Sequence, residues 1–402
     1  MSKQGTAGVR QPGVVQGAAL ILPITMAVMG VSALTAVIPQ MEDHFGKVPH
    51  HQYIVPILMT VPAVWILLFS PIAGWLADHM GRRRILIAAM LVYAFVGTMP
   101  TYLEGIFPIF LSRCGVGICE SVVLTVSTTM LSDYFKGRAR ERWLAAQTAF
   151  ASLASLIIIP VGGLLGSLLG WRGPFYLYSY SLLLVVVVAL FTWEPDQSDR
   201  VAEDLEAAAD AFYQRMPWGR VASLCSLSLV AAVFFYTVIT QNGNALFALG
   251  VTDPSRIGLY TTLCSIALPL GSFLYGRYAA RFDIGYLVCC EFALIGGGFL
   301  LMSQAGSPAE YTAYAAINQF GCGMVLPTML VWTTRGLAYS IRGLGTGLWQ
   351  GSFTVGQFAT ALVIPFLCEW RGSLDMAFSA VGTAAMIISG CALGATRISR
   401  RY

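Results

Sequence analysis

The stretch from Gly74 to Leu86 reads GWLADHMGRRRIL and decides the fold of this chain. It lies between two apolar runs, one ending at Trp75 and the next beginning at Ile85, which leaves nine residues for the turn. Its glycines permit a tight turn and a close approach of neighbouring helices. Asp78 and Arg82 are four residues apart and can pair across one helical turn. We therefore expect two antiparallel membrane helices joined by a short charged hinge.

The composition indicates a polytopic membrane protein. Of the 402 residues, 56% are hydrophobic and 11% are charged, and the mean hydropathy is +0.70. A helix needs about 20 apolar residues to cross the hydrocarbon core. The sequence contains twelve such runs, at roughly 18–40, 52–77, 84–103, 106–134, 142–169, 173–193, 219–249, 255–281, 284–305, 308–339, 342–368 and 373–395. The segment from Met1 to Gln16 has no apolar core, so we expect no cleaved signal peptide and a retained first span.

The basic residues predict the orientation. Cytoplasmic loops hold an excess of Lys and Arg. With the amino terminus in the cytoplasm, 19 of the 24 Lys and Arg residues lie inside and four lie outside, while Arg113 lies within the fourth span. We expect both termini to be cytoplasmic in a plasma membrane, here a bacterial inner membrane. The net charge of +4 then reflects topology, and no nucleic-acid partner is expected.

The chain divides into two halves. Between Glu194 and Trp218 the apolar pattern stops and seven acidic residues appear, which predicts a linker that acts as a spacer. Apolar residues from Val201 to Phe212 recur at helical spacing, so an amphipathic helix along the cytoplasmic face is the alternative. The flanking spans repeat, since AGWLADHM at 73–80 can be laid over YGRYAARF at 275–282. We expect a tail (1–17), a six-helix bundle (18–193), the linker (194–218), a second six-helix bundle (219–396) and a tail (397–402).

The pattern G-x-L-A-D-x-x-G-R-R from Gly74 to Arg83 resembles the signature loop of the major facilitator superfamily, with His79 where the family more often has Arg. The resemblance implies an all-α membrane protein whose twelve transmembrane helices form two pseudo-symmetric six-helix bundles. It implies a transporter rather than an enzyme, with the substrate site near the midplane between the halves. Its expected partners are a small-molecule substrate, protons and the lipid bilayer; we expect a monomer and no cofactor.

The fifth span carries a second, looser resemblance. Its residues Ile159-Pro160-Val161-Gly162-Gly163 are similar to G-P-x-x-G-G, a motif of drug and proton antiporters, but Ile replaces the first glycine and one intervening residue is missing. Proline and glycines here bend a helix and let it pack closely against a partner from the other half. The similarity favours exchange over uptake, although packing glycines occur in any membrane bundle.

Charged residues inside the spans are the main functional candidates, because each costs at least about 2.5 to 3.5 kcal/mol to insert. Arg113 and Glu120 are seven residues apart and share a face of the fourth helix. Arg113 and Gly117 resemble the family's R-x-x-x-G motif, whose Arg is associated with proton coupling, so the resemblance makes Arg113 the tuner of a proton-binding Glu120. Burial favours the neutral acid and a nearby Arg favours the carboxylate. Alternatives are a structural Arg113–Glu120 pair and Arg113 as a clamp for a substrate anion.

Other charged positions have separate expectations. Asp133 lies at the cytoplasmic end of the fourth helix, where the resemblance lets it join Asp78 and Arg82 in a cytoplasmic gate; a solvated helix end is the alternative. Glu291, in the ninth span, is expected to make a polar contact between helices.

Neutral polar and aromatic residues within the spans are candidates for the substrate-binding site, although each of them also fits a hydrogen bond between helices. They suggest a largely apolar pocket with scattered polar anchors, which suits an amphipathic small molecule. The candidates are Trp65, Gln147, Tyr236, Gln241, Asn242, Asn244, Asn318, Gln319, Gln350 and Gln357, together with Arg113 and Glu120.

Several chemistries lose support. The nine cysteines have no metal-ligand spacing, so no metal is expected, and His44, His50 and His51 are interpreted as an exposed external loop. The phosphate-loop, zinc-pair and nucleophile-turn motifs of ATP-driven pumps and hydrolases do not occur in the sequence. The sequence predicts a secondary transporter that works by alternating access, with proton-coupled export of a small amphipathic molecule. The alternatives are an uptake symporter for a small organic anion and a non-transporting receptor or assembly protein on the same fold.

Overall fold

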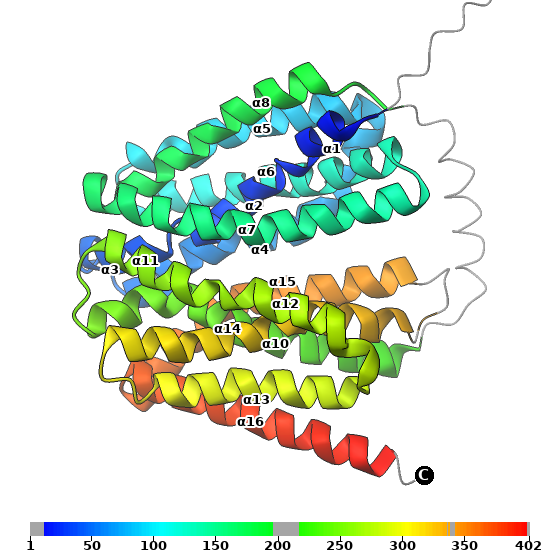
Figure 1. The fold of residues 1–402 in the computed structure, drawn as a ribbon. Coiled ribbons are helices and arrows are strands. Elements are labelled where there is room, and N and C mark those ends of the chain that lie inside the picture. Colours follow the sequence, from blue (N-terminus) through cyan, green and yellow to red (C-terminus); the bar gives the residue numbers. More distant parts are fainter. Residues whose placement is uncertain (1–11, 196–216, 336, 338–341, 400–402) are drawn as a thin grey trace, which may run out of the picture.

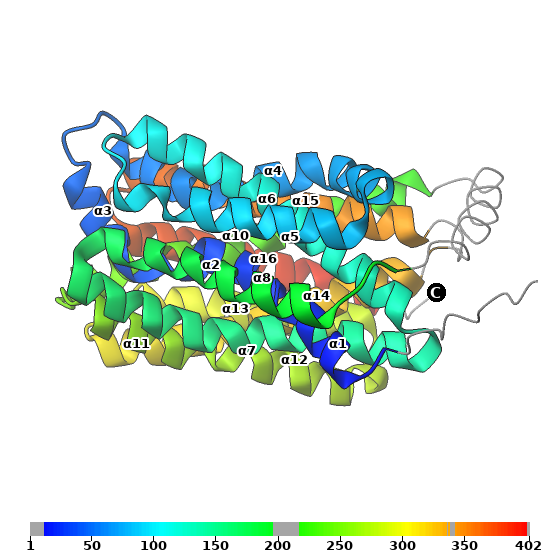
Figure 2. The same cartoon turned by 90° about the horizontal axis from the view of Figure 1, so that it is seen from above.

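The computed structural model describes residues 12–195, 217–335, 337 and 342–399. These residues form helices and connecting turns, with no β-strand among them. Figure 1 shows the helices as two layers, α1 to α8 above and α10 to α16 below, and Figure 2 shows them running along the same long direction. The interpretation of the linker between Val201 and Phe212 lies outside the described residues.

The amino-terminal half contains α1 (Val14–Ile21), α2 (Ile24–Ser32), η1 (Thr35–Val37), α3 (Ile38–His44), α4 (His51–Met80), α5 (Arg82–Thr98), η2 (Met99–Thr101), α6 (Ile106–Tyr134), α7 (Gly137–Leu169), η3 (Gly170–Ser179) and α8 (Tyr180–Phe191). The carboxy-terminal half contains α10 (Trp218–Ala248), α11 (Pro254–Ser265), α12 (Ala267–Tyr278), η4 (Ala279–Arg281), α13 (Ile284–Met302), α14 (Pro308–Arg335), α15 (Arg342–Arg371) and α16 (Leu374–Ser399).

The described residues include eleven helical stretches that are long and apolar enough to cross a membrane. One of them, Gly137–Phe191, has 55 residues and runs through α7, η3 and α8. A single crossing needs about 20 residues, and Figure 1 shows α7 and α8 as two separate helices. Dividing this stretch at η3 matches the twelve spans expected from the sequence, and the all-α fold is confirmed.

Two spans are broken where one continuous helix was expected. The first span consists of α1, α2, η1 and α3, and Pro23 immediately precedes α2 while Pro39 lies in the first turn of α3. The eighth span consists of α11, which ends at Ser265, and α12, in which Pro269 is the third residue. Proline has no N–H and its ring clashes with the carbonyl four residues earlier. Proline therefore explains the breaks at α2 and α12.

Each half has its own apolar core. One buried cluster is built from residues between Leu20 and Val188, and a second is built mainly from residues between Ala231 and Ala385. The halves meet where α7 packs on α11 and α4 packs on α15. Ala36 of η1 packs in the core of the carboxy-terminal half, so the broken first span also contacts that half.

The first and last described helices of each half have their outer ends at the same end of the molecule (Figure 1). The start of α1, the end of α8, the start of α10 and the end of α16 lie together on the right of Figure 1. We call this the linker end, and we call the opposite end, which carries α3, the far end. The cytoplasmic location of the linker end stays a prediction from the charge pattern.

Candidate functional site

The signature loop forms a charged cluster at the linker end. The Arg82 side chain donates to Asp78 Oδ1 at 2.7 Å and also pairs with Asp133. The Arg82 and Asp133 side chains are each 5% exposed, whereas that of Asp78 is 54% exposed. The backbone N–H groups of Arg82 and Arg83 donate to the carboxylate of Glu194, at 2.5 and 3.1 Å. The cluster therefore joins α4, α5, α6 and Glu194, which lies three residues beyond the end of α8, all within one half.

This cluster brings together the three residues predicted as a cytoplasmic gate. In this conformation the contacts of Arg82 with Asp78, Asp133 and Glu194 connect neighbouring helices of the amino-terminal half. Gly81, between α4 and α5, has a φ of +93°, and a Cβ there would lie 3.2 Å from Glu194 Oε2. A glycine at this position permits both the turn and the approach of Glu194.

Arg113 lies at the centre of the amino-terminal half and is fully buried. Its guanidinium donates to the carbonyl of Leu58 on α4 at 2.9 Å, the hydroxyl of Tyr178 on η3 at 2.5 Å and the carbonyl of Gly30 on α2 at 2.5 Å. Its carbon Cζ also lies 5.4 Å from the centre of the Tyr178 ring. Arg113 thus holds four segments together, and its three donor nitrogens are all in use.

Glu120 lies two turns further along α6 and is 2% exposed. Its Oε1 lies 3.5 Å from the Tyr93 hydroxyl, which itself donates to the carbonyl of Met26 at 2.7 Å. A Cβ at Gly30 would lie 2.6 Å from Glu120 Oε1, so this carboxyl rests against the bare backbone of α2. Arg113 and Glu120, both among the described residues, form no ion pair within 4 Å; they meet instead at Gly30.

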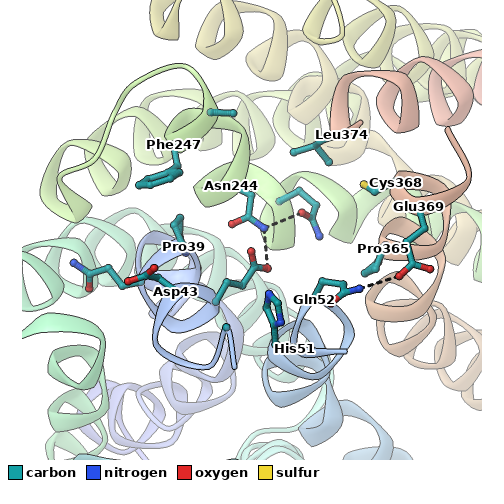
Figure 3. A pocket seen from close by; sticks show the side chains of 15 residues that line it. Pro39, Asp43, His51, Gln52, Asn244, Phe247, Pro365, Cys368, Glu369 and Leu374 are labelled. Carbon is teal, nitrogen blue, oxygen red and sulfur yellow. Dashed lines mark hydrogen bonds between the residues drawn. The ribbon is translucent and has the colours of Figure 1, made fainter. Parts of the chain in front are cut away.

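A cavity of about 800 Å³ opens between the halves at the far end. Figure 3 shows side chains from both halves pointing into it, including Asp43, His51, Asn244 and Glu369. The fifteen residues that line it include the acids Glu42, Asp43 and Glu369 and no Lys or Arg. The remaining lining residues are Pro39, Gln40, Gly46, His51, Gln52, Gln241, Asn244, Phe247, Ala248, Pro365, Cys368 and Leu374.

Three hydrogen bonds cross from one half to the other around this cavity. Glu369 accepts one from Gln52 Nε2 at 2.8 Å, drawn in Figure 3, and one from the Tyr53 hydroxyl at 2.6 Å. On another side of the cavity, Asn244 Nδ2 donates to Glu42 Oε1 at 3.0 Å. We call this set of five residues the far-end latch.

The neutral candidates fall into three groups. Gln241 and Asn244 line the cavity and hydrogen-bond to each other at 3.3 Å. Asn242 accepts from Tyr311, and Asn318 donates to the carbonyl of Ile295, so these two join helices within the carboxy-terminal half. The others lie outside the cavity lining: Trp65, Tyr236 and Gln357 are half-buried, Gln147 and Gln319 are buried, and Gln350 is exposed.

Glycines make the expected close approach between the halves. A Cβ at Gly163 on α7 would lie 2.5 Å from the carbonyl oxygen of Pro254 and 3.1 Å from the Cα of Gly258 on α11. A Cβ at Gly243 on α10 would lie 2.4 Å from the carbonyl oxygen of Thr35. Backbones come this close only where side chains are missing.

The sequence reasoning did not single out Glu42, Glu369, Tyr93 or Tyr178. Glu42 and Glu369 lie just beyond the expected first and eleventh spans (18–40 and 342–368), where charged residues are ordinary. Both residues line the cavity because α3 packs against α10 and α4 packs against α15, and the sequence does not indicate this packing. His51, interpreted as an exposed loop residue, also lines the cavity.

The residues 20–252 match the model of the Major Facilitator Superfamily, which is more than half of the chain. The chain is 24% identical over 350 residues to the probable sulfoacetate transporter SauU of Cupriavidus necator, covering 80% of this chain and 78% of the relative. It is 25% identical over 392 residues to the putative multidrug resistance protein MdtD of Shigella boydii, covering 90% and 76%.

A solved structure shares the fold. The inward-facing bacterial homologue of the human lysosomal transporter Spinster matches with a TM-score of 0.74 at 14% identity, over 94% of each chain. The fold and the family model together define a multi-pass membrane transporter. The chain belongs to the Major Facilitator Superfamily.

Proposed function

We propose that this chain exports a small amphipathic molecule, neutral or cationic, in exchange for protons. The observation that carries the proposal is the position of Glu120, a buried carboxyl that rests against Gly30 and is 2% exposed. Ionisable residues inside a membrane protein are costly and mark proton or substrate pathways. A shift of α2 relative to α6 would change the surroundings of this carboxyl and hence its affinity for a proton.

The cavity supports the substrate class. Its wall combines apolar residues with the acids Glu42, Asp43 and Glu369, and its fifteen lining residues include His51 but no Lys or Arg. Acids attract cations and tolerate neutral molecules with hydrogen-bond donors, whereas they repel organic anions. The similarity to a putative multidrug resistance protein agrees with this class.

Uptake of a small organic anion is the second candidate, and the similarity to a probable sulfoacetate transporter favours it. It requires a cationic group that can reach the anion. Arg113, the expected clamp, is fully buried and donates to Leu58, Tyr178 and Gly30. We therefore favour export of a neutral or cationic molecule over uptake of an anion.

The mechanism we propose is alternating access of the bundles 18–193 and 219–396 in a single chain, with the linker end in the cytoplasm of a bacterial cell. Opening the far end has to break the far-end latch, and the Asp78–Arg82–Asp133 cluster acts as the gate at the linker end. Gln241 and Asn244 are the neutral residues best placed to meet substrate, because they lie in the cavity wall.

Proton flux in liposomes tests the proposal. Purified protein is reconstituted with a pH-sensitive dye inside, and lipophilic cations, neutral amphiphiles and organic acids are added one at a time. We expect a cation or a neutral amphiphile to drive proton movement in the wild type and not in Glu120→Gln. Glu291→Gln is the matched control, since it removes another buried carboxyl and should leave coupling intact. Flux that is unchanged in Glu120→Gln would remove this residue from coupling.

A further inference from the structure

A second cavity, of about 340 Å³, lies within the carboxy-terminal half, away from the interface between the halves. We call it the α12–α14 groove. Its lining comes from α12, η4, α13 and α14, and consists of Leu274, Tyr275, Tyr278, Ala279, Phe282, Tyr286, Leu287, Cys290, Phe320 and Met324. Its volume is within the range of small-molecule sites, and its wall is almost wholly apolar.

The groove has a buried floor and an exposed rim. Tyr275, Leu287 and Met324 pack together as a small core of their own. Tyr278 and Phe282 are 41% and 55% exposed, so the rim faces outward. In a membrane protein such a surface meets lipid chains, and tyrosines with one apolar side and one polar tip favour the depth of the headgroups.

Three exposed arginines lie on the elements that form the groove. Arg277 on α12 and Arg281 on η4 are exposed and alternate with lining residues, and exposed Arg335 ends α14 close enough to Tyr275 to act on it electrostatically. Arg281 Cζ lies 5.6 Å from the centre of the Tyr278 ring, which holds this guanidinium at the rim. Asp283, the residue before α13, is the acid in the same turn, and the buried Glu291 on α13 also acts electrostatically on Tyr275. Three exposed arginines are therefore set against two acids around the groove.

We propose that the α12–α14 groove binds an anionic phospholipid, with one acyl chain in the apolar channel and the phosphate between Arg277, Arg281 and Arg335. Guanidinium groups bind phosphate with several parallel hydrogen bonds. Clusters of basic residues at the cytoplasmic surface attract anionic lipids, which fits the linker end of this chain. An apolar channel that ends in a basic mouth has the shape and charge of such a lipid. This site is separate from the proposed transport pathway.

Two cysteines allow the site to be tested without any transport assay. Cys290 lines the groove and is exposed, while Cys391 on α16 is exposed and lies outside the groove lining. The delipidated full chain, with the other seven cysteines replaced by serine or alanine, is treated with an apolar maleimide, and the modification rates of the two thiols are measured by mass spectrometry. Phosphatidylglycerol and phosphatidylcholine with the same acyl chains are titrated in detergent micelles.

We expect phosphatidylglycerol to slow modification of Cys290 about tenfold more than phosphatidylcholine does, with no effect on Cys391. Arg277→Gln combined with Arg281→Gln should abolish that preference. Arg138→Gln combined with Arg140→Gln removes the same charge from exposed positions on α7 and should keep it.

Three outcomes would overturn the proposal. Equal protection by both lipids would indicate an ordinary lipid belt. An equal loss of preference in the α7 control would indicate a response to net charge alone. Protection by glycerol phosphate, which has no acyl chain, would indicate a free phosphate site rather than a lipid site.

Discussion

Glu120 on α6 and Gly30 on α2 touch across the amino-terminal half, such that a β-carbon at position 30 would lie 2.6 Å from Glu120 Oε1. The same glycine offers its carbonyl to Arg113 at 2.5 Å. One backbone position of the broken first span therefore contacts both buried charges of the fourth span. A movement of α2 would therefore change the surroundings of Arg113 and Glu120 at the same time. Such a change alters the proton affinity of the Glu120 carboxyl.

Gly30→Ala tests this contact. The added methyl group overlaps the carboxyl, and overpacking of a buried site costs about 1 to 3 kcal/mol. We expect Gly30→Ala to lower the unfolding temperature in detergent. We also expect it to lower substrate-driven proton flux in liposomes. Gly394→Ala on α16 is the control, because a Cβ there meets nothing within 4 Å. Full proton flux in Gly30→Ala would contradict the assignment of this contact to coupling.

Arg113→Gln tests the buried arginine. The shorter amide cannot serve the acceptors of Leu58, Gly30 and Tyr178 together, and breaking a buried charged network costs about 3 to 5 kcal/mol. Tyr178→Phe removes one of these partners, so we expect a smaller cost of about 1 to 3 kcal/mol. The unfolding temperatures of the two variants show which of them loses more stability. A stable Arg113→Gln protein that has lost only anion binding would instead support the clamp interpretation.

The sequence predicts the fold well because membrane spans depend on local composition. The fourth span was expected at 106–134, and α6 has those limits. The breaks in the first and eighth spans were missed because a broken and a continuous span have the same mean hydropathy. Their prolines were the available signal.

The site could be predicted only in part. Burial of Arg113 and Glu120 follows from their positions within an apolar run, and the structure places both in the core. Their partners lie 83 and 27 residues away, at Gly30 and Tyr93, and no periodicity in the chain indicates such contacts. Glu42 and Glu369 face one cavity only because the two halves pack together.

Glu369→Gln tests the far-end latch. The amide replaces a carboxylate that accepts from Gln52 and Tyr53, and hydrogen bonds to a charged acceptor are the stronger kind. We expect the far end to open more often, measured as a longer mean distance between spin labels placed on residues 47 and 373. Glu104→Gln changes an exposed acid in the turn before α6 and should leave the distance unchanged. Equal distances in wild type and Glu369→Gln would show that the latch does not hold this end.

Asp133→Asn and Asp78→Asn together test how burial sets the strength of the linker-end cluster. Both carboxylates pair with Arg82, but the side chain of Asp133 is 5% exposed and that of Asp78 is 54% exposed. Water screens an exposed pair, which contributes about 0.2 to 1 kcal/mol, whereas removing one partner of a buried pair costs about 3 to 5 kcal/mol. We expect Asp133→Asn to lower the thermal stability clearly more than Asp78→Asn does. If Asp78→Asn leaves stability intact but slows substrate flux in liposomes, the exposed carboxylate acts in gating rather than in holding the helices together. An equal loss of thermal stability in the two variants would contradict the ranking by burial.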